Sequence, residues 1–219
     1  ITSVRRHKAL LELALPRLAG FGDGFALRDD RLICQRLHAA FGNTCIEDLA
    51  LPLRVQTTCA TDGSSVVLER GRLDQALRAS IALPFLFAPQ RVGGRLLVDG
   101  SLSDPLPVPT FTSGPAHSGS ALATVALGFR VPFPRSANTA TRLATRVTAA
   151  LSNNLLDSRL AAVDPRRLVL MLPVLDRRVG LFDTEAMPYL LEVGRQAAEA
   201  ALPRLLRMLG TPLRCVASA

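Results

Sequence analysis

The sequence places one carboxylate where chemistry is commonly built. Asp99 and Gly100 follow directly on the short apolar segment 95–98, and Pro105 and Pro107 come soon after. A turn at the end of a buried strand is a frequent location for functional side chains, and an aspartate there can accept a proton. Because Asp-Gly is also a common turn signal, the surrounding residues must decide between the two interpretations.

Partners for such a base are scarce. The only imidazoles are His7, His38 and His117, and a Ser-His-Asp triad requires one of them. His38 falls on a predicted helix and His117 in a loop, which favours packing or surface roles. The flanking serines are Ser80, Ser101 and Ser103. We interpret Ser80 as helix packing and the other two as turn hydrogen-bonders, with a substitute nucleophile among them as the alternative.

Metal and redox chemistry have little support in the sequence. The four cysteines are Cys34, Cys45, Cys59 and Cys215, and they form no C-x-x-C pair and have no histidine at zinc-ligand spacing. No calcium-binding loop is visible either. We therefore expect reduced cysteines, no metal and no cofactor, in a cytoplasmic protein.

Composition bounds the size and the partners. A chain of 219 residues, 48% hydrophobic and 20% charged, is sufficient for a single globular domain spanning 1–219. The longest apolar run, 121–129, is half of what a bilayer span requires and is typical of a buried strand. The net charge of +8 is compatible with peripheral contact with an anionic membrane, but the basic residues are nearly all Arg and are scattered among Leu, Ala and Pro, which favours a composition effect over a dedicated basic surface. Aromatics make up only 5%, so we expect no nucleic acid partner.

Helices and strands alternate along the chain. Apolar spacing and end signals predict helices at 5–19, from Asp30 to Gly42, at 72–82, 139–160 and 187–209, and strands at 53–59, 65–68, 95–98, 121–129 and 168–172. Asp29 or Asp30 can cap the helix that ends at Gly42, and Thr44 and Glu47 have the spacing of a capping box that starts a short helical turn. The first two strands flank a Thr61-Asp62-Gly63 turn and resemble a hairpin. Overall the alternation predicts a layered α/β domain with a mainly parallel sheet.

Two long segments resemble a known family. The run 78–89 (RASIALPFLFAP) and the run 94–108 (GRLLVDGSLSDPLPV) closely resemble the segment that leads into and includes the Asp-Gly motif of bacterial patatin-like phospholipases. Shorter similarities lie at 46–53, 67–71, 180–183 and 191–198. Together they cover about residues 30 to 205. One departure is Cys59, which occupies a position where the family usually has Asp; Asp62 is a candidate for compensating.

The resemblance implies a three-layer α/β/α fold and a hydrolase that uses a Ser-Asp dyad. In it, Asp99 of the Asp-Gly-Ser motif is the catalytic base, with Gly100 supporting the motif. The family's serine lies in a G-x-S-x-G turn, and a Gly-rich loop supplies oxyanion donors. Neither motif occurs in the 219 residues. We therefore expect the serine, the first strand and the first helix in an N-terminal segment upstream of Ile1, and we expect the chain alone to be inactive.

Three functions remain open. The first is a lipid acyl hydrolase, a phospholipase or esterase acting on phospholipid, lysophospholipid or a similar ester. The second is a non-catalytic lipid- or membrane-binding protein on the same fold. The third is acyl transfer to an acceptor other than water, which uses the same dyad. A serine in the upstream segment distinguishes the enzymes from the binding protein.

Overall fold

The computed structural model describes residues 30–84, 87–112, 124–133, 140–177, 179 and 183–210. The chain divides into two compact units, residues 1–103 and 104–219, and each is described by itself. The single domain expected for 1–219 stays a prediction. The expected helix at 5–19 lies outside the described residues.

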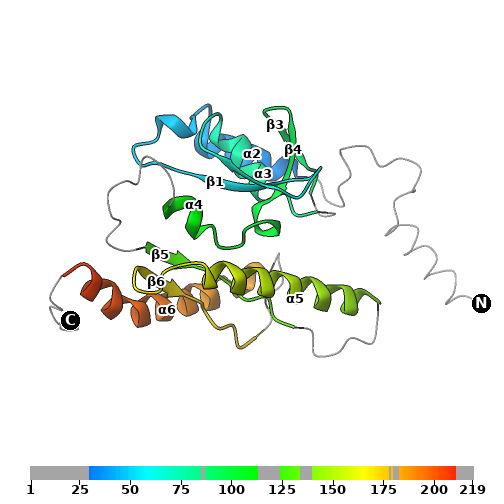
Figure 1. The fold of residues 1–219 in the computed structure, drawn as a ribbon. Helices are drawn as coiled ribbons and strands as arrows, with labels where there is room; N and C mark the ends of the chain where they lie inside the picture. The colour runs from blue at the N-terminus through cyan, green and yellow to red at the C-terminus, as the bar shows by residue number, and fades with distance from the viewer. Residues whose placement is uncertain are drawn as a thin grey trace, which may run out of the picture. The chain divides into compact units, whose positions relative to one another are not determined.

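The first unit is built on a four-stranded sheet in the order β2-β1-β4-β3 (Figure 1). Its strands are β1 (Val55–Cys59), β2 (Ser65–Leu68), β3 (Gln90–Val92) and β4 (Arg95–Asp99). Every pairing among them is antiparallel. The hairpin expected at β1 and β2 is confirmed, whereas β3 was not predicted.

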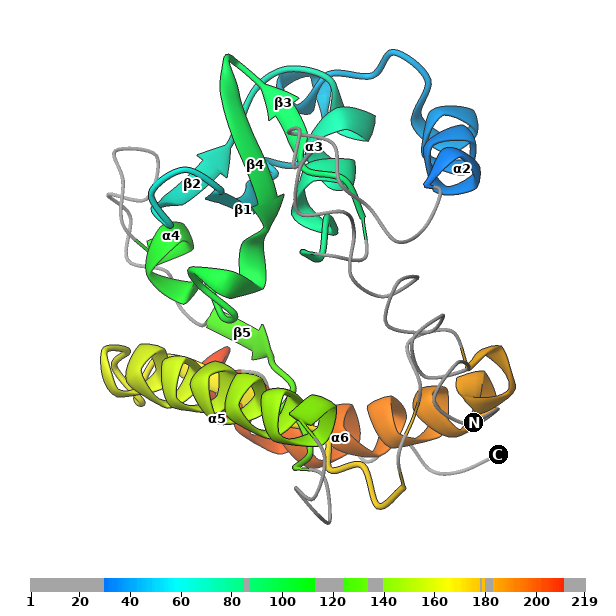
Figure 2. The ribbon, with the colours of Figure 1, turned by 90° about the vertical axis from the view of Figure 1, so that its right-hand side faces the viewer.

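The expectation of a mainly parallel sheet is wrong for this unit, and the connections explain why. Gly93 and Gly94, at φ 56° and 77°, form a two-residue link between β3 and β4 (Figure 2). Such a link joins only antiparallel strands, and positive φ at both positions is what its geometry requires. Parallel pairing is confined, among the described strands, to β5 (Thr124–Leu127) and β6 (Leu168–Met171) of the second unit.

Helix α3 (Leu73–Ser80) packs on the first sheet through residues at helical spacing. Leu73, Ala76 and Ala79 are buried, and they contact apolar residues of β1, β2 and β4. The helix expected at 72–82 is thus confirmed, although it ends two residues early. Burial stabilises the fold by about 1.5–3 kcal/mol for Leu73 and by about 0.8 kcal/mol for each alanine methyl group.

Helix α2 (Arg31–Phe41) and the 3-10 helix η1 (Ile46–Asp48) form where helical turns were expected, but without the predicted caps. The carboxylate of Asp30 forms an ion pair with Arg78 at 2.8 Å instead of capping α2. Glu47 accepts a hydrogen bond from the Gly71 amide at 2.8 Å rather than closing a capping box. Both acids therefore join neighbouring segments of the first unit.

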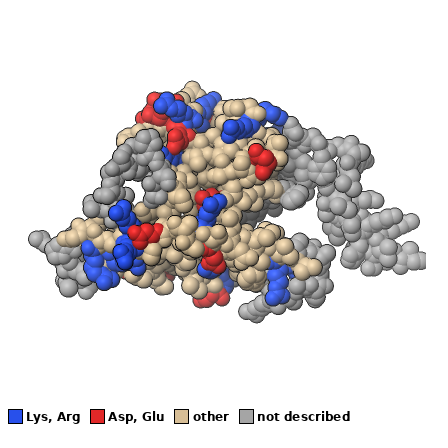
Figure 3. Space-filling view, in the orientation of Figure 1, with Lys and Arg blue, Asp and Glu red and all other residues tan. Residues whose placement is uncertain are grey.

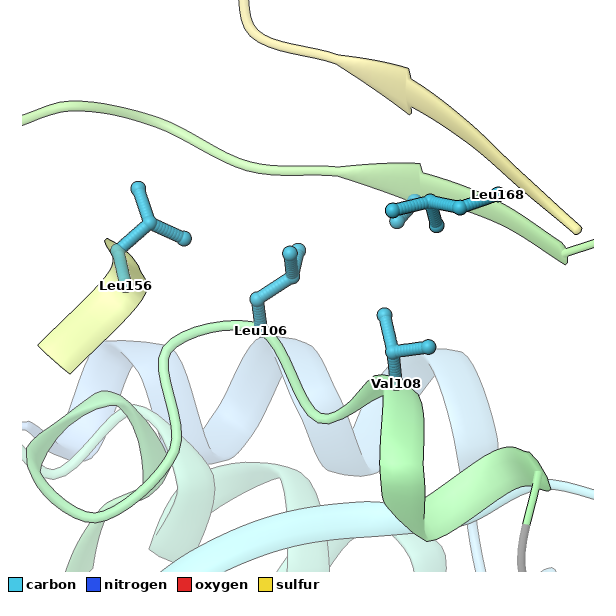
Figure 4. Close-up of a cluster of buried hydrophobic side chains, with 5 residues drawn as sticks. Leu106, Val108, Leu156 and Leu168 are labelled. Carbon is cyan, nitrogen blue, oxygen red and sulfur yellow. The ribbon is translucent and has the colours of Figure 1, made fainter. Parts of the chain in front are cut away.

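The described part of the second unit contains β5, β6 and the following helices: α4 (Val108–Thr112), α5 (Ala140–Ala161), η4 (Thr184–Ala186) and α6 (Met187–Met208). Its core joins β5, β6, α5 and the segment before α4 through a cluster of buried side chains (Figure 4): Leu106, Val108, Ala126, Leu156 and Leu168. The long helices and both strands confirm the sequence predictions, with slightly shifted ends.

Much apolar surface of the second unit stays exposed. Val125 and Leu127, on one face of β5, are 49% and 52% exposed. Three residues at helical spacing along α5, Leu143, Val147 and Leu151, are 52%, 50% and 65% exposed. Parallel strands are normally covered on both faces. The exposed apolar residues of β5 and α5 thus depart from the usual burial of parallel strands and of the helices that cover them.

The described helices include none with the length and apolar content of a bilayer span. On the face shown in Figure 3, basic side chains lie singly or in small groups with acidic ones among them. On that face the positive charge is therefore dispersed.

Candidate active site

Asp99 is the last residue of β4, and its main chain is held on both sides. Its amide donates to the carbonyl of Ala82 at 3.0 Å, and its carbonyl accepts a hydrogen bond from the Thr58 hydroxyl at 2.8 Å. In the sheet, Asp99 lies opposite Thr57 of β1. These contacts fix where the strand ends and the turn begins.

The Asp99 carboxylate caps the 3-10 helix η2 (Gly100–Leu102). Its Oδ1 accepts two hydrogen bonds from Ser101, one from the amide at 2.8 Å and one from the hydroxyl at 2.5 Å. Oδ2 accepts no hydrogen bond from the residues that the structure describes. The side chain is half-buried, so this second oxygen can still meet a donor. Ser101 is thus a turn hydrogen-bonder, as predicted.

Gly100 is buried against the main chain of Gln56. A Cβ atom built at this position lies 2.7 Å from the Gln56 carbonyl carbon and 3.0 Å from its Cγ, closer than real Cβ contacts. The turn can approach β1 this closely only because residue 100 has no side chain. This gives a physical reason for glycine after Asp99.

A polar cluster that the sequence analysis missed lies behind the turn. Ser103 Oγ lies 2.8 Å from Thr58 Oγ1 and 3.2 Å from Gln56 Nε2. The signal available in the sequence was the run of polar residues 56–58 between the apolar residues Val55 and Cys59. Only the pairing of β1 with β4 brings these polar residues close to Asp99. The cluster lies entirely within the first unit.

The comparison with known families agrees with this geometry. The family model for patatin-like phospholipase matches residues 3–112, half of the chain, and the match includes Asp99 and Gly100. The chain belongs to the patatin-like phospholipase family. Its α/β fold agrees with that membership.

Curated relatives of this patatin-like chain include mycobacterial proteins. An uncharacterized NTE family protein of Mycobacterium tuberculosis (strain ATCC 25618 / H37Rv) is 38% identical over 102 residues, 47% of this chain and 27% of the relative. A protein of the same description in Mycobacterium bovis (strain ATCC BAA-935 / AF2122/97) gives the same figures. A second one from the same M. tuberculosis strain is 39% identical over 80 residues, 36% of this chain and 13% of the relative. The matched stretch thus spans about a quarter or less of these relatives.

His38 is the histidine that the structure describes. It takes part in an ion-pair cluster with Asp74 and Arg72, and this cluster contains no serine. His38 Nδ1 lies 3.3 Å from Asp74 Oδ2, and Arg72 binds the same carboxylate at 2.6 and 3.0 Å. Hydrogen bonds from Arg72 lower the pKa of Asp74, with burial opposing. The cluster joins α2 to α3, which is a structural role. His7 and His117 lie outside the described residues.

The departure at Cys59 has a local explanation in this patatin-like chain. Asp62 closes the turn between β1 and β2, accepting from the Ser64 amide at 2.9 Å and hydroxyl at 2.7 Å. These bonds, with a smaller contribution from the Cys59 thiol, lower the pKa of Asp62 to about 2. Cys59 itself is buried in the apolar cluster with Val66 and Leu97. Asp62 thus places a carboxylate in the loop after Cys59, and its compensation for the family's Asp stays a prediction.

Within the part of the chain that the structure describes, no three His, Cys, Asp or Glu side chains converge as metal ligands. A hollow of about 400 Å³ in the second unit is lined by Arg130, Pro132 and residues 172–175. Its lining has one cation and no carboxylate.

Proposed function

We propose that this chain supplies the general base, Asp99, of a serine-type lipid acyl hydrolase that works through a Ser-Asp dyad. The observation that carries the proposal is the state of the carboxylate: Oδ1 is fixed by Ser101, and Oδ2 is open to a further donor. Membership of the patatin-like phospholipase family supports it.

In the proposed reaction the serine hydroxyl gives its proton to Asp99 Oδ2 while its oxygen attacks the ester carbonyl carbon. The tetrahedral intermediate expels the alcohol, which takes the proton from Asp99 and leaves an acyl-serine. Water then attacks the acyl carbon and gives a proton to the same carboxylate. The proton returns to the serine as the fatty acid leaves, and the enzyme is restored.

We propose that the serine comes from sequence outside these 219 residues. No G-x-S-x-G occurs in the chain, and the hydroxyls of Ser101 and Ser103 are engaged in the turn. The exposed apolar faces of β5 and α5 support a three-layer fold whose central sheet is completed by a further strand and helix. The chain alone is then inactive, because it lacks the nucleophile and the oxyanion donors, which alone account for about 10²–10³ in rate.

The proposed substrates are phospholipids, lysophospholipids or similar esters, with peripheral contact to an anionic membrane supported by the net charge of +8. Acyl transfer to another acceptor follows the same steps with that acceptor in place of water. A lipid- or membrane-binding protein without catalysis, on the same fold, is the second candidate. It holds if the segment before residue 1 has no serine in a G-x-S-x-G turn.

The test uses a polypeptide that joins this chain to its serine-bearing segment. Asp99→Asn keeps the Ser101 hydrogen bonds but cannot accept the serine proton, so hydrolysis of a chromogenic short-chain ester should fall by about 10³-fold or more. The matched control is Asp62→Asn, since Asp62 binds Ser64 in the same way in another turn. Full activity in the Asp99 variant excludes Asp99 as the base.

A further inference from the structure

The Thr58 side chain makes contacts that the proposed mechanism has not used. It is 4% exposed, and its hydroxyl lies 2.8 Å from the Asp99 carbonyl and 2.8 Å from the Ser103 hydroxyl. Asp99 and Ser103 are the two ends of the turn that contains Gly100 and Ser101. One buried hydroxyl therefore joins both ends of the turn to the middle of β1.

The direction of these hydrogen bonds follows from the number of protons. The Asp99 carbonyl can only accept, so the single Thr58 hydroxyl proton goes to it. The bond between the two hydroxyls then uses the Ser103 proton. Ser103 Oγ also lies 3.2 Å from Gln56 Nε2, and the carbonyls of Gly100 and Thr57 are more distant from it than Thr58, at 3.4 and 3.5 Å. Donors thus run from Ser103 through Thr58 to Asp99.

The Gln56 side chain lies beside these hydrogen bonds and leaves one of its own polar atoms unsatisfied among the described residues. Its Nε2 also binds Ser65 Oγ at 2.7 Å and the Thr57 carbonyl at 3.0 Å, while its Oε1 is buried without a partner among the described residues. Burying an unsatisfied amide oxygen is unfavourable. The two Nε2 protons go to the two nearer acceptors, Ser65 and the Thr57 carbonyl, so the Gln56 amide joins β1 to β2 and is a weaker contact for Ser103.

We propose that Thr58, held by Ser103, is a positioning residue that sets the direction of the Asp99 carboxylate; the proposal rests on the proposed function of Asp99. The carboxylate is tied to Ser101, so its direction depends on the path of the turn. The Thr58 bond fixes the Asp99 carbonyl and hence the rotation with which the turn starts. A displacement of about 1 Å at a reacting group can cost about 10²-fold in rate.

Two neighbouring threonines provide a matched test. Thr57 and Thr58 are both buried in β1, and both hydroxyls donate to a carbonyl of the adjacent strand: Thr57 to Val66 at 2.7 Å, Thr58 to Asp99 at 2.8 Å. The substitution to Val has the same shape and removes one bond to a carbonyl in each case, and Thr58→Val also removes the bond between the Thr58 and Ser103 hydroxyls. Only the Thr58 bond ends on the Asp99 turn.

In the serine-bearing polypeptide, Thr58→Val should lower kcat by about 10–100-fold with KM changed by less than about 3-fold. Thr58→Ser, which restores the hydroxyl, should recover most of kcat. Thr57→Val should lose similar stability but keep kcat within about 3-fold. Equal kcat in the two Val variants, or no recovery in Thr58→Ser, overturns the positioning role.

A second measurement does not need catalysis. In the 219-residue chain, amide hydrogen exchange of residues 100–102 should be faster in Thr58→Val than in Thr57→Val. If the wild-type polypeptide shows no ester turnover while this difference is present, the proposed function fails and the control of the turn by Thr58 stands. If exchange is the same in both variants, Thr58 does not fix the turn.

Discussion

Ser101 holds Asp99 by two hydrogen bonds that end on the same carboxylate oxygen, Oδ1, at 2.8 and 2.5 Å. A carboxylate held at one oxygen keeps its orientation and presents the other oxygen in a fixed direction. Hydrogen bonds to a charged acceptor are also stronger than neutral ones. The pair therefore behaves as one unit, in which a serine that is not a nucleophile orients the base.

The chain contains a second copy of the same local arrangement. Asp62, Gly63 and Ser64 repeat the Asp-Gly-Ser order, and the Asp62 carboxylate also accepts from the amide and the hydroxyl of the serine. The glycines differ: Gly63 has φ 74° and open space around it, whereas Gly100 packs on Gln56. The three residues alone therefore do not define a site, and the second copy serves as an internal control.

Ser101→Ala removes the hydroxyl bond to Asp99 and leaves the amide bond. We expect kcat of the serine-bearing polypeptide to fall about 10-fold with little change in KM, because the carboxylate loses part of its orientation. Ester turnover measured over a range of substrate concentrations separates the two constants. Ser64→Ala loses the equivalent bond in the other turn and should leave kcat unaltered. If both variants turn over alike, orientation through Ser101 has no catalytic effect.

Gly100→Ala places a methyl group against the Gln56 carbonyl. Relieving that overlap must displace the turn or β1, and we expect a loss of about 1–3 kcal/mol in the free energy of unfolding. Gly194→Ala is the comparison, since its position on α6 has nothing within 4 Å and helix propensity gains up to about 1 kcal/mol. Urea unfolding of the 219-residue chain should thus shift in opposite directions. A Gly100→Ala midpoint equal to wild type means that the turn is not tightly packed there.

Local signals predicted most of the elements. Apolar spacing located α3, α5 and α6, and turn residues located the β1–β2 hairpin. The sheet arrangement was not predictable in the same way, because β3 has only three residues and no apolar alternation. Its pairing depends on the Gly93-Gly94 turn, whose significance is clear only when β4 is already known to follow. Because of that turn, β3 pairs with β4 in the antiparallel direction, whereas the sequence predicted a mainly parallel sheet.

The residues of the candidate site were likewise predictable only in part. Asp99 and Gly100 could be identified from the sequence because the residues around them resemble a family segment. Thr58 and Gln56 could not, since they are about 40 residues away and meet Asp99 only through the register of β1 with β4. Acidic residues expected at helix caps were likewise misassigned, because Arg78 is a stronger partner for Asp30 than the free amides of α2.

Asp104, in the second unit, is a carboxylate whose burial should make stability depend on pH. Its side chain is 7% exposed, its Oδ1 accepts from the Leu106 amide at 3.2 Å, and Arg159 lies 3.6 Å away. Burial raises the pKa of Asp104, and Arg159 and the Leu106 amide only partly oppose it. The unfolded chain therefore loses this proton at lower pH than the folded one, and the free energy of unfolding falls as pH rises through that window.

Asp104→Asn keeps an oxygen for the Leu106 amide and carries no charge at any pH. The variant should unfold at a higher temperature than wild type at pH 7, by on the order of 2–4 °C, and the difference should vanish below about pH 4. Asp164→Asn is the control, because Asp164 makes the same turn bond to the Arg166 amide at 2.9 Å but is exposed to solvent, so removing its charge brings no gain. A lower melting temperature for Asp104→Asn at pH 7 means that attraction to Arg159 exceeds the cost of burial, which reverses the sign argued for Asp104.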